Sequence, residues 1–293
     1  MSTLIQISDP HFGTEQPPVV AALLDLVKRV KPLAAVLSGD ITQRARRAQF
    51  DAARNFVDQL GVRHRLVIPG NHDIPLFNIA ARVFSPYAGF ERVFGSVLEP
   101  QVECDGFRLI GVNTTRPSRH KDGEISTEQI ERVARELRGA SADQLRIVVT
   151  HQPVHVLRSS EVHNRVHGYR SAVHAWAAAG ADIIMGGHIH LPYVASLSDE
   201  FPELPRRCWI VQAGTAVSHR VRANHANSVN VIHHSPGSTD CYVERWDYDA
   251  ANCSFQCASS GQLLLDRANA GAAGSSRCTE RRGGNSENVC SSR

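Results

Sequence analysis

Short, mostly apolar runs recur through the first two thirds of the chain, and each run gives way to a polar cluster. They cover residues 3–8, 33–38, 66–69, 109–112, 147–150 and 183–185. Runs of this length, bounded by polar and turn-forming residues, are typical of buried β-strands. Longer segments with helical spacing separate them. This alternation of strand and helix predicts an α/β layered fold.

Four of the intervening segments repeat apolar residues at the spacing of an amphipathic helix. We expect helices close to residues 20–30, 50–60, 130–137 and 171–179. Ser126, followed three residues later by Gln129, is a typical capping box. It predicts where the third of these helices begins.

The pattern changes at two places. Asp105-Gly106, between two strand-like segments, is a strong signal for a β-hairpin. After His190 the helical periodicity stops, and five further strand-like segments follow. These segments are residues 193–197, 207–212, 230–234, 241–247 and 254–257. We therefore expect a second, more antiparallel sheet that packs against the first.

The C-terminal segment has a different composition from the rest of the chain. Residues 268–293 are small, polar and Gly-rich, and they contain too few apolar side chains to fold. We expect one folded domain over residues 1–267 and a disordered tail over residues 268–293.

The overall composition excludes several classes of protein. Apolar residues make up 42% of the 293 residues and charged residues 21%, as is usual for a globular protein. No stretch approaches the roughly 18–20 apolar residues of a membrane span. A strand-like run begins almost at the N-terminus, so no signal peptide fits and we expect a cytoplasmic protein. The net charge of +3 is too mild to favour a nucleic-acid surface, and a homodimer is one oligomeric state that the sequence allows.

Potential metal ligands follow five of the predicted strands. They are Asp9, His11, Asp40, Asn71, His151, His188 and His190. The ligand crevice of an open α/β sheet lies beyond the carboxyl ends of its strands, so these side chains can converge on one spot. Carboxylate, amide and imidazole groups together suit a pair of divalent transition metals.

The motifs that contain these ligands differ in how specific they are. Asp-x-His at residues 9–11 and Gly-Asp at residues 39–40 are weak signals, since short motifs often match by chance. Gly-Asn-His-Asp at residues 70–73 is more specific. Gly-His-Ile-His at residues 187–190 is stronger still, because two imidazoles come from one tight turn. The ordered set, with His151 as its fifth member, favours a metal site over coincidence.

This ordered set resembles the pattern of the calcineurin-like metallophosphoesterase superfamily, and the resemblance extends over residues 4–249. It implies a four-layer α/β/β/α sandwich of two mixed sheets, with a dinuclear metal site at the strand ends. Within the superfamily, the chain most resembles the bacterial class III cyclic-nucleotide phosphodiesterases. Its compact length and the blocks at residues 37–42 and 69–73 carry that narrower resemblance.

The resemblance also implies how the metals are held. Asp40 would bridge the two ions, while the other six ligands divide into two sets. Asp9, His11 and His190 would hold one metal, and Asn71, His151 and His188 the other. Mixed nitrogen and oxygen ligation suits Mn²⁺, Fe²⁺/Fe³⁺, Co²⁺ or Zn²⁺ better than Mg²⁺ or Ca²⁺.

In such a site a metal-bridging hydroxide would attack phosphorus, and two further residues would assist. His72 would face the substrate, stabilise the developing charge and help to protonate the leaving oxygen. Asp73 would orient an imidazole or cap the following helix. Arg116 could hold a phosphate, although a solvated loop is an equal interpretation, and Gly214-Thr215 is expected to approach the metals.

The leading interpretation is a metal-dependent hydrolase of small phosphodiesters, with 3′,5′-cyclic nucleotides such as cAMP as its substrates. A DNA-repair nuclease of the same superfamily is the main alternative, but no strongly basic surface favours nucleic acid. A lipid-precursor hydrolase would need a long apolar insertion. A protein phosphatase would need a Gly-Asp-x-x-Asp-Arg-Gly block, whereas Asp40 is followed here by Ile-Thr-Gln-Arg. A non-catalytic scaffold would have lost catalytic residues that this chain retains.

Overall fold

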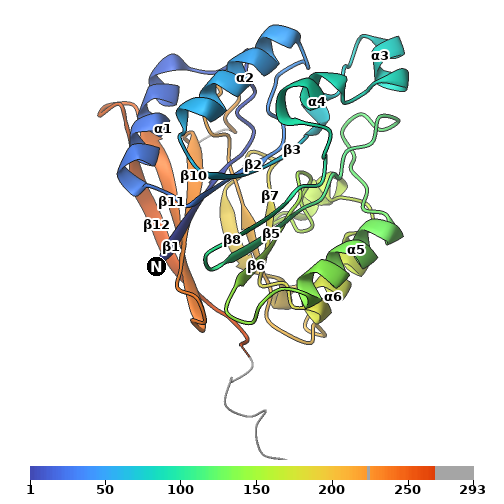
Figure 1. Cartoon of the computed structure of the whole chain (residues 1–293), viewed down its shortest axis with the longest axis vertical. Coiled ribbons are helices and arrows are strands. Elements are labelled where there is room, and N and C mark those ends of the chain that lie inside the picture. Colours follow the sequence, from blue (N-terminus) through green and yellow to red (C-terminus); the bar gives the residue numbers. More distant parts are fainter. Residues whose placement is uncertain (223–224, 268–293) are drawn as a thin grey trace, which may run out of the picture.

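The computed structural model describes residues 1–222 and 225–267. Twelve strands form two six-stranded sheets that pack face to face (Figure 1). The strands are β1 Ser2–Ile7, β2 Ala34–Ser38, β3 His64–Ile68, β4 Gln101–Cys104, β5 Phe107–Gly111, β6 Leu145–Val149, β7 Ile183–Gly186, β8 Tyr193–Ser196, β9 Trp209–Gln212, β10 Ser228–His234, β11 Asp240–Asp249 and β12 Ser254–Leu264. The first sheet has the order β12-β11-β10-β1-β2-β3 and the second the order β4-β5-β6-β7-β9-β8.

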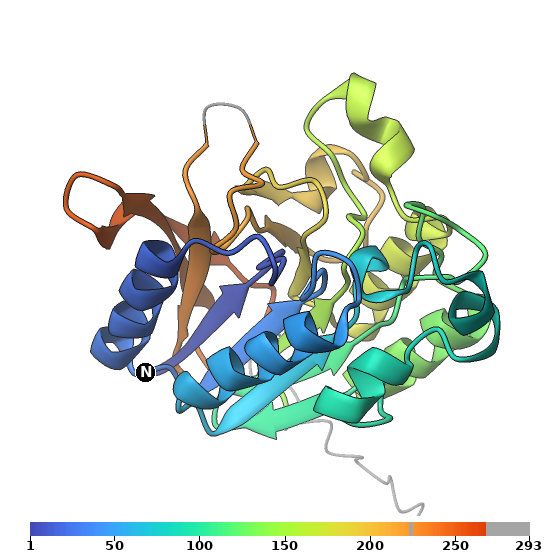
Figure 2. The same cartoon turned by 90° about the horizontal axis from the view of Figure 1, so that it is seen from above.

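Helices cover the outer face of each sheet (Figures 1 and 2). The α-helices of the described residues are α1 Pro17–Val30, α2 Arg47–Gln59, α3 Ile79–Phe84, α4 Ala88–Phe94, α5 Thr127–Arg138 and α6 Tyr169–Ala179. Helices α1 and α2 pack on the first sheet, and α5 and α6 pack on the second. The four-layer α/β/β/α sandwich of two mixed sheets is therefore confirmed.

The burial of β1 shows why apolar residues occur on both of its faces. Leu4 faces the core between the two sheets, where it packs with residues of β2 and β6. Its neighbour Ile5 faces the opposite way, into the core beneath α1 and α2. A strand that is covered on both faces gains free energy from apolar side chains at every position.

The parallel strands of both sheets present their carboxyl ends to one region. In the first sheet, β1 pairs in parallel with β2, and β2 with β3. In the second sheet, β5, β6, β7 and β9 are parallel in that order. The loops that follow these strands carry the candidate ligands, so the topology supplies the convergence that the sequence pattern predicts.

The four predicted helices are confirmed as α1, α2, α5 and α6. Helix α5 has the expected capping box, in which Gln129 N donates to Ser126 Oγ at 3.3 Å and Ser126 N donates to Gln129 Oε1 at 2.9 Å. The hairpin is also confirmed, since β4 and β5 pair across Asp105-Gly106. Helices α3 and α4 were not predicted. Both are short, with six residues in α3 and seven in α4, which leaves too few turns for a clear helical periodicity.

The expectation of a separate, more antiparallel second sheet is wrong. The C-terminal strands divide between the two sheets, because β8 and β9 extend the second sheet while β10, β11 and β12 complete the first. Strand β10 pairs antiparallel with β1, so that Leu4 lies opposite Ile232. Local periodicity identifies a strand but carries no information about its distant partner.

The tail expected at residues 268–293 lies outside the described residues. Within the described part of the chain, no helix is both long enough and apolar enough to cross a membrane.

Candidate metal centre

The structure brings the predicted ligands together at the meeting point of the two sheets. Asp9 and His11 follow β1, Asp40 follows β2, and the other four follow β3, β6 and β7. Three groups of side chains have ligand atoms within 4.8 Å of one another. These groups are Asp9, His11 and His190; His11, Asp40 and His72; and Asp40, His151 and His188.

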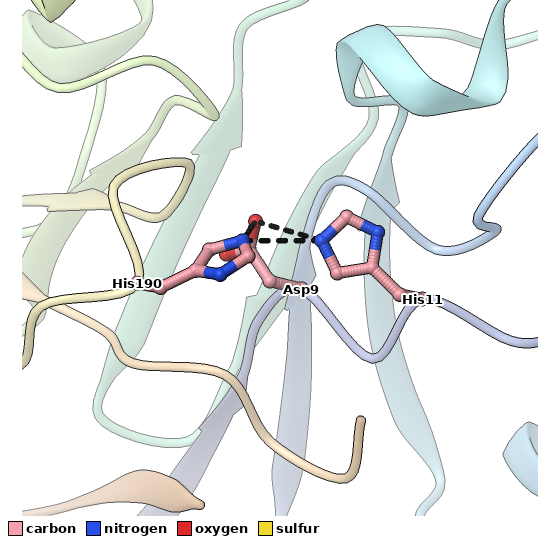
Figure 3. Close-up of side chains that lie close together, drawn as sticks. All are labelled: Asp9, His11 and His190. Carbon is pink, nitrogen blue, oxygen red and sulfur yellow. Dashed lines mark hydrogen bonds and ion pairs between the residues drawn. The ribbon is translucent and has the colours of Figure 1, made fainter. Parts of the chain in front are cut away.

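The first group forms a compact set of donors (Figure 3). His190 Nε2 lies 3.3 Å from Asp9 Oδ1 and 3.1 Å from His11 Nε2. Asp9 Oδ1 and His11 Nε2 are 3.8 Å apart. Ligands about 2.1 Å from one ion stand about 3.0–3.4 Å from each other at ordinary coordination angles. The spacing of these three donors therefore suits one metal ion.

Asp40 connects this group with the donors around His151. Its Oδ1 lies 3.2 Å from His151 Nε2, whereas its Oδ2 lies 3.8 Å from His11 Nε2. Asn71 Oδ1 is 3.3 Å from the same nitrogen of His151. One carboxylate oxygen thus faces each set of donors, which is the arrangement of a bridging ligand.

The backbone at these ligands adopts an uncommon conformation. Five of them have the positive φ angles of the left-handed region, where side chains other than glycine are disfavoured. They are Asp9 at 50°, His11 at 46°, Asp40 at 50°, His188 at 70° and His190 at 55°. Strain of this kind concentrates at functional sites, where the surrounding fold holds the chain in place.

The glycine of each motif makes room for a ligand of another motif. A Cβ atom built on Gly39 would come closer than 3.0 Å to the His151 ring, and one on Gly187 closer than 3.0 Å to the Asp9 carboxylate. Gly39 also has a φ of 94°. Both positions therefore require glycine for space, and Gly39 for its conformation as well.

Hydrogen bonds behind the ligands orient them. His151 Nδ1 donates to the Ser38 carbonyl at 2.9 Å, and His190 Nδ1 donates to the Arg220 carbonyl at 2.6 Å. Because a carbonyl only accepts, each Nδ1 carries a proton, and Nε2 is the nitrogen that faces the cluster. Asp9 Oδ2 accepts a 2.6 Å hydrogen bond from Ser8 Oγ, which fixes its carboxylate.

Burial and mutual charge set the protonation states of the ligands. Burial lowers the pKa of His11 and His188 to about 3, so both imidazoles are neutral. Burial acts in the same direction on His151, but the Asp40 charge outweighs it and raises the pKa of His151 to about 9. Burial disfavours ionised Asp9, yet its interaction with His190 lowers the pKa of Asp9 to about 2.

These donors fit the dinuclear metal site that such a cluster would form. They combine imidazole nitrogens with carboxylate and amide oxygens, as transition metals prefer. His188 Nδ1 and His11 Nδ1 are buried without a hydrogen-bond partner among the described residues. Two neutral imidazoles and two ionised carboxylates in a buried cluster are the forms in which these groups bind cations.

His72 lies at the edge of the cluster and differs from the ligands. Its Nδ1 donates to the Gln43 carbonyl at 2.9 Å, which leaves Nε2 facing outward. Arg220 Nη1 lies 3.2 Å from that Nε2 and can only donate to it. A guanidinium opposite this nitrogen opposes metal binding there, but Nε2 also lies 4.0 Å from Asp40 Oδ2, and His72 belongs to one of the three groups of donors. Its side chain lines a cavity.

Asp73, predicted to orient an imidazole or to cap the following helix, has no imidazole among its hydrogen-bond partners in the described part of the chain. Its Oδ2 accepts from Ile41 N at 3.0 Å and Gly70 N at 2.9 Å. Its Oδ1 accepts from Thr42 N at 2.7 Å and Thr42 Oγ1 at 2.8 Å. The carboxylate instead joins the loop after β2 to the loop after β3. Burial and the Asp40 charge raise the pKa of Asp73 to about 7, against these hydrogen bonds.

A cavity of about 300 Å³ opens above the cluster. It is lined by Asp40, Asn71, His72, Lys121, Asn164, His188, Ile189, His190, Arg220 and Arg222. No sequence motif marked the cations among these residues as part of the site. The signal that could have found them was the expected approach of Gly214-Thr215 to the metals, since Arg220 lies six positions beyond Gly214 in the loop after β9.

Arg116, the arginine that the sequence suggested, lies elsewhere. It donates to Gln129 Oε1 at 2.7 Å and to the carbonyls of Asn113 and Thr115, and it does not line the cavity. Gln152 contacts the backbone of a cavity residue, since its Nε2 donates to the Lys121 carbonyl at 3.1 Å.

Solved structures of known proteins share this fold. A purple acid phosphatase from yellow lupin seeds superposes with a TM-score of 0.66 and 12% identity, over 90% of this chain and 53% of that one. A dimetal phosphatase from Danio rerio gives a TM-score of 0.61 and 12% identity, over 90% of this chain and 99% of that one.

Sequence comparison identifies the family. A protein from Synechococcus sp. named "probable cyclic nucleotide phosphodiesterase" is 28% identical over 163 residues. The match covers 52% of this chain and 58% of that protein, so it spans little more than half of the relative's length. The profile of the calcineurin-like phosphoesterases matches residues 2–192, which contain all seven candidate ligands and His72. This chain belongs to the calcineurin-like phosphoesterase family.

Proposed function

We propose that this protein hydrolyses small phosphodiesters, with 3′,5′-cyclic nucleotides such as cAMP as the first candidates. The observation that carries phosphoester hydrolysis is the buried His/Asp cluster with His72 on the wall of the cavity above it. The cyclic-nucleotide assignment is supported by the name of the relative from Synechococcus. The size of the cavity, about 300 Å³, suits a small ester.

The seven residues predicted as ligands would hold the ions. Asp9, His11 and His190 form one set and Asn71, His151 and His188 the other, with Asp40 between them. When bound, two transition-metal ions would lower the pKa of a water nucleophile and offset negative charge on the phosphoryl oxygens.

His72 is the residue that would act directly on the substrate. The Gln43 carbonyl accepts the hydrogen bond from Nδ1 and thereby holds the ring with Nε2 toward the cavity. From this position Nε2 can exchange a proton with the leaving oxygen. Asp73 would contribute indirectly, because it joins the loop that carries Asp40 to the loop that carries His72.

A substrate panel tests the proposal. The purified, Mn²⁺-reconstituted protein should be assayed on 3′,5′- and 2′,3′-cyclic nucleotides, linear diesters, matching monoesters and DNA. We expect kcat/KM for a cyclic nucleotide or small diester to exceed that for the matching monoester. Faster cleavage of monoesters or of long DNA under the same conditions would contradict the diester assignment. Absence of turnover on every ester, with both metals bound, would contradict the enzymatic function itself.

A further inference from the structure

Arg220 has a cationic side chain that no acidic group neutralises. Within residues 1–222 and 225–267, no carboxylate lies within ion-pair distance of its guanidinium. Its partners are the Gln43 amide, where Nη1 donates to Oε1 at 2.9 Å, and the ring of His72. Neither partner is a carboxylate, and both contact Nη1. The other guanidinium nitrogens therefore remain able to bind a ligand in the cavity.

The backbone of Arg220 is fixed by the metal cluster. Its carbonyl accepts hydrogen bonds from His190 Nδ1 at 2.6 Å and from Thr215 Oγ1 at 3.2 Å, and its N–H donates to Ser218 Oγ at 3.0 Å. Because its backbone is held by the candidate metal ligand His190, Arg220 projects its side chain into the cavity from a defined position. This preorganisation lowers the entropy cost of binding an anion there.

The two other cations that line the cavity, Arg222 and Lys121, differ in whether a carboxylate offsets their charge. Arg222 pairs with Glu161 and also donates to the Ile189 carbonyl, so its charge is already offset. Lys121 lines the cavity, and its ammonium has no carboxylate partner in the part of the chain that the structure describes. Arg220 and Lys121 are thus the two cations of this cavity whose charges remain free.

The charge balance favours a ligand with more than one negative charge. Asp9 and Asp40 offset only half of the charge that two divalent ions would bring, and Arg220 and Lys121 add two further positive charges. A phosphodiester carries one negative charge. A phosphomonoester carries nearly two above its second pKa of about 6, and in a partly dry cavity the additional charge is strongly attracted.

We propose that Arg220 and Lys121 form a cation pair that binds the second negative charge of a phosphomonoester. The monoester released by diester hydrolysis then binds more tightly than the diester that enters. This inference rests on the proposed function for the placement of the phosphoryl group at the metal cluster.

Two probes that contain no ester bond test the proposal without turnover. Inorganic phosphate at about pH 8 is mainly a dianion, whereas dimethylphosphinate is a monoanion of similar shape. Calorimetric titration of the Zn²⁺-loaded protein should show tighter binding of phosphate. In Arg220→Ala we expect phosphate binding to weaken about 10- to 100-fold, the usual effect of losing a hydrogen bond between charged groups. Binding of the phosphinate should weaken less, so that the ratio of the two dissociation constants narrows.

Matched variants separate this role from a structural one. Arg116→Ala removes an arginine outside the cavity and should leave both affinities unchanged. Lys121→Ala removes an exposed side chain, so it should fold normally and weaken phosphate binding by a smaller factor of about 3–10. Metal content is measured for every variant, and Arg220→Lys, which retains the charge, should bind phosphate more tightly than Arg220→Ala.

The outcomes are distinguishable from those of the substrate panel. Unchanged phosphate affinity in both Arg220→Ala and Lys121→Ala would overturn the cation pair, whatever the enzyme hydrolyses. Equal weakening of phosphate binding and phosphinate binding would also overturn it, since the second negative charge would then contribute nothing to the affinity. If the wild type cleaves no diester but its phosphate binding depends on Arg220, the cation pair stands and the proposed function fails.

Discussion

Gly70 packs directly against Asp40, although the two residues belong to loops after different strands. A Cβ atom at position 70 would come closer than 3.0 Å to both the backbone nitrogen and the Oδ1 atom of Asp40. Asp40 is the residue placed between the two sets of donors, and its backbone already has a strained φ of 50°. The absence of a side chain at Gly70 is therefore a condition for the geometry of the whole cluster.

Gly70→Ala should disrupt the metal centre. The added methyl group must displace Asp40, so we expect elemental analysis to give clearly fewer than the two metal equivalents of the wild type. The free energy of unfolding should fall by about 1–3 kcal/mol, the usual cost of overpacking. Gly261→Ala is the matched control, because a Cβ there meets no atom within 4 Å. Two bound metals in Gly70→Ala would show that the site can adjust.

Asp40→Ala should reduce metal occupancy at both positions, since it removes the one side chain that faces both sets of donors. Asn71→Ala is the comparison, because Asn71 lies near His151 in only one set. We expect that variant to retain close to one equivalent. Elemental analysis after reconstitution checks both. Full metal content and activity in Asp40→Ala would disprove the bridging assignment.

His72→Ala should retain both metals and the fold but lose about 10²–10⁴-fold in kcat, the usual scale of general acid–base assistance. The loss should be smaller for substrates with good leaving groups, because these need less protonation. The measurement is kcat on a series of aryl diesters of graded leaving-group pKa. Equal losses across the series would indicate phosphate binding or charge stabilisation instead of proton transfer.

Metal binding should strengthen as the pH rises from about 6 to about 9. Although burial opposes it, Asp40 raises the pKa of His151 to about 9, so this ligand must release a proton before it binds an ion. His11 and His188, with pKa values of about 3, are already neutral. The dissociation constant should fall by up to about tenfold per pH unit, as measured by competition with a chelator. A dissociation constant independent of pH would contradict this protonation state.

The stability of the metal-free protein should change in the opposite direction. A pKa of His151 raised from 6.5 to about 9 contributes stability that is complete below pH 6.5 and is lost as the pH rises through 9. Below about pH 6.5 the trend does not continue. Burial lowers the pKa of His11 and His188 from 6.5 to about 3, and these two groups act against Asp73, whose pKa burial raises from 3.8 to about 7. Urea unfolding of the metal-free protein at several pH values checks the trend.

The folded domain should tolerate an end at Arg267 but not at Leu264. Leu265 is buried, and Arg267 Nη2 lies 3.0 Å from a carboxylate oxygen of the buried Asp182. Removing residues 265–267 as well as 268–293 should cost about 2 kcal/mol or more of unfolding free energy, mainly through the lost burial of Leu265. Removing only residues 268–293 should leave the melting temperature unchanged. A large drop in that shorter truncation would show that the tail contributes to the fold.

Much of the fold could be predicted because the relevant signals are local. A strand covered on both faces buries most of its side chains, so β1, β2 and β6 are rich in apolar residues. The helical stripes of α1, α2, α5 and α6 are equally local, as is the capping box at Ser126. Helix α3 gave no such signal, since its six residues are too few to establish a helical periodicity.

By itself, the sequence determined the strands, the main helices and the ligand residues at the strand ends, because each depends on neighbours along the chain. The tertiary structure decided which sheet each C-terminal strand joined, that Asp73 supports two loops, and that Arg220 faces His72 from 148 positions away. Contacts between such distant residues depend on how whole layers pack. Periodicity records that a side chain is buried or exposed, but the identity of its partner is set only when the two sheets meet.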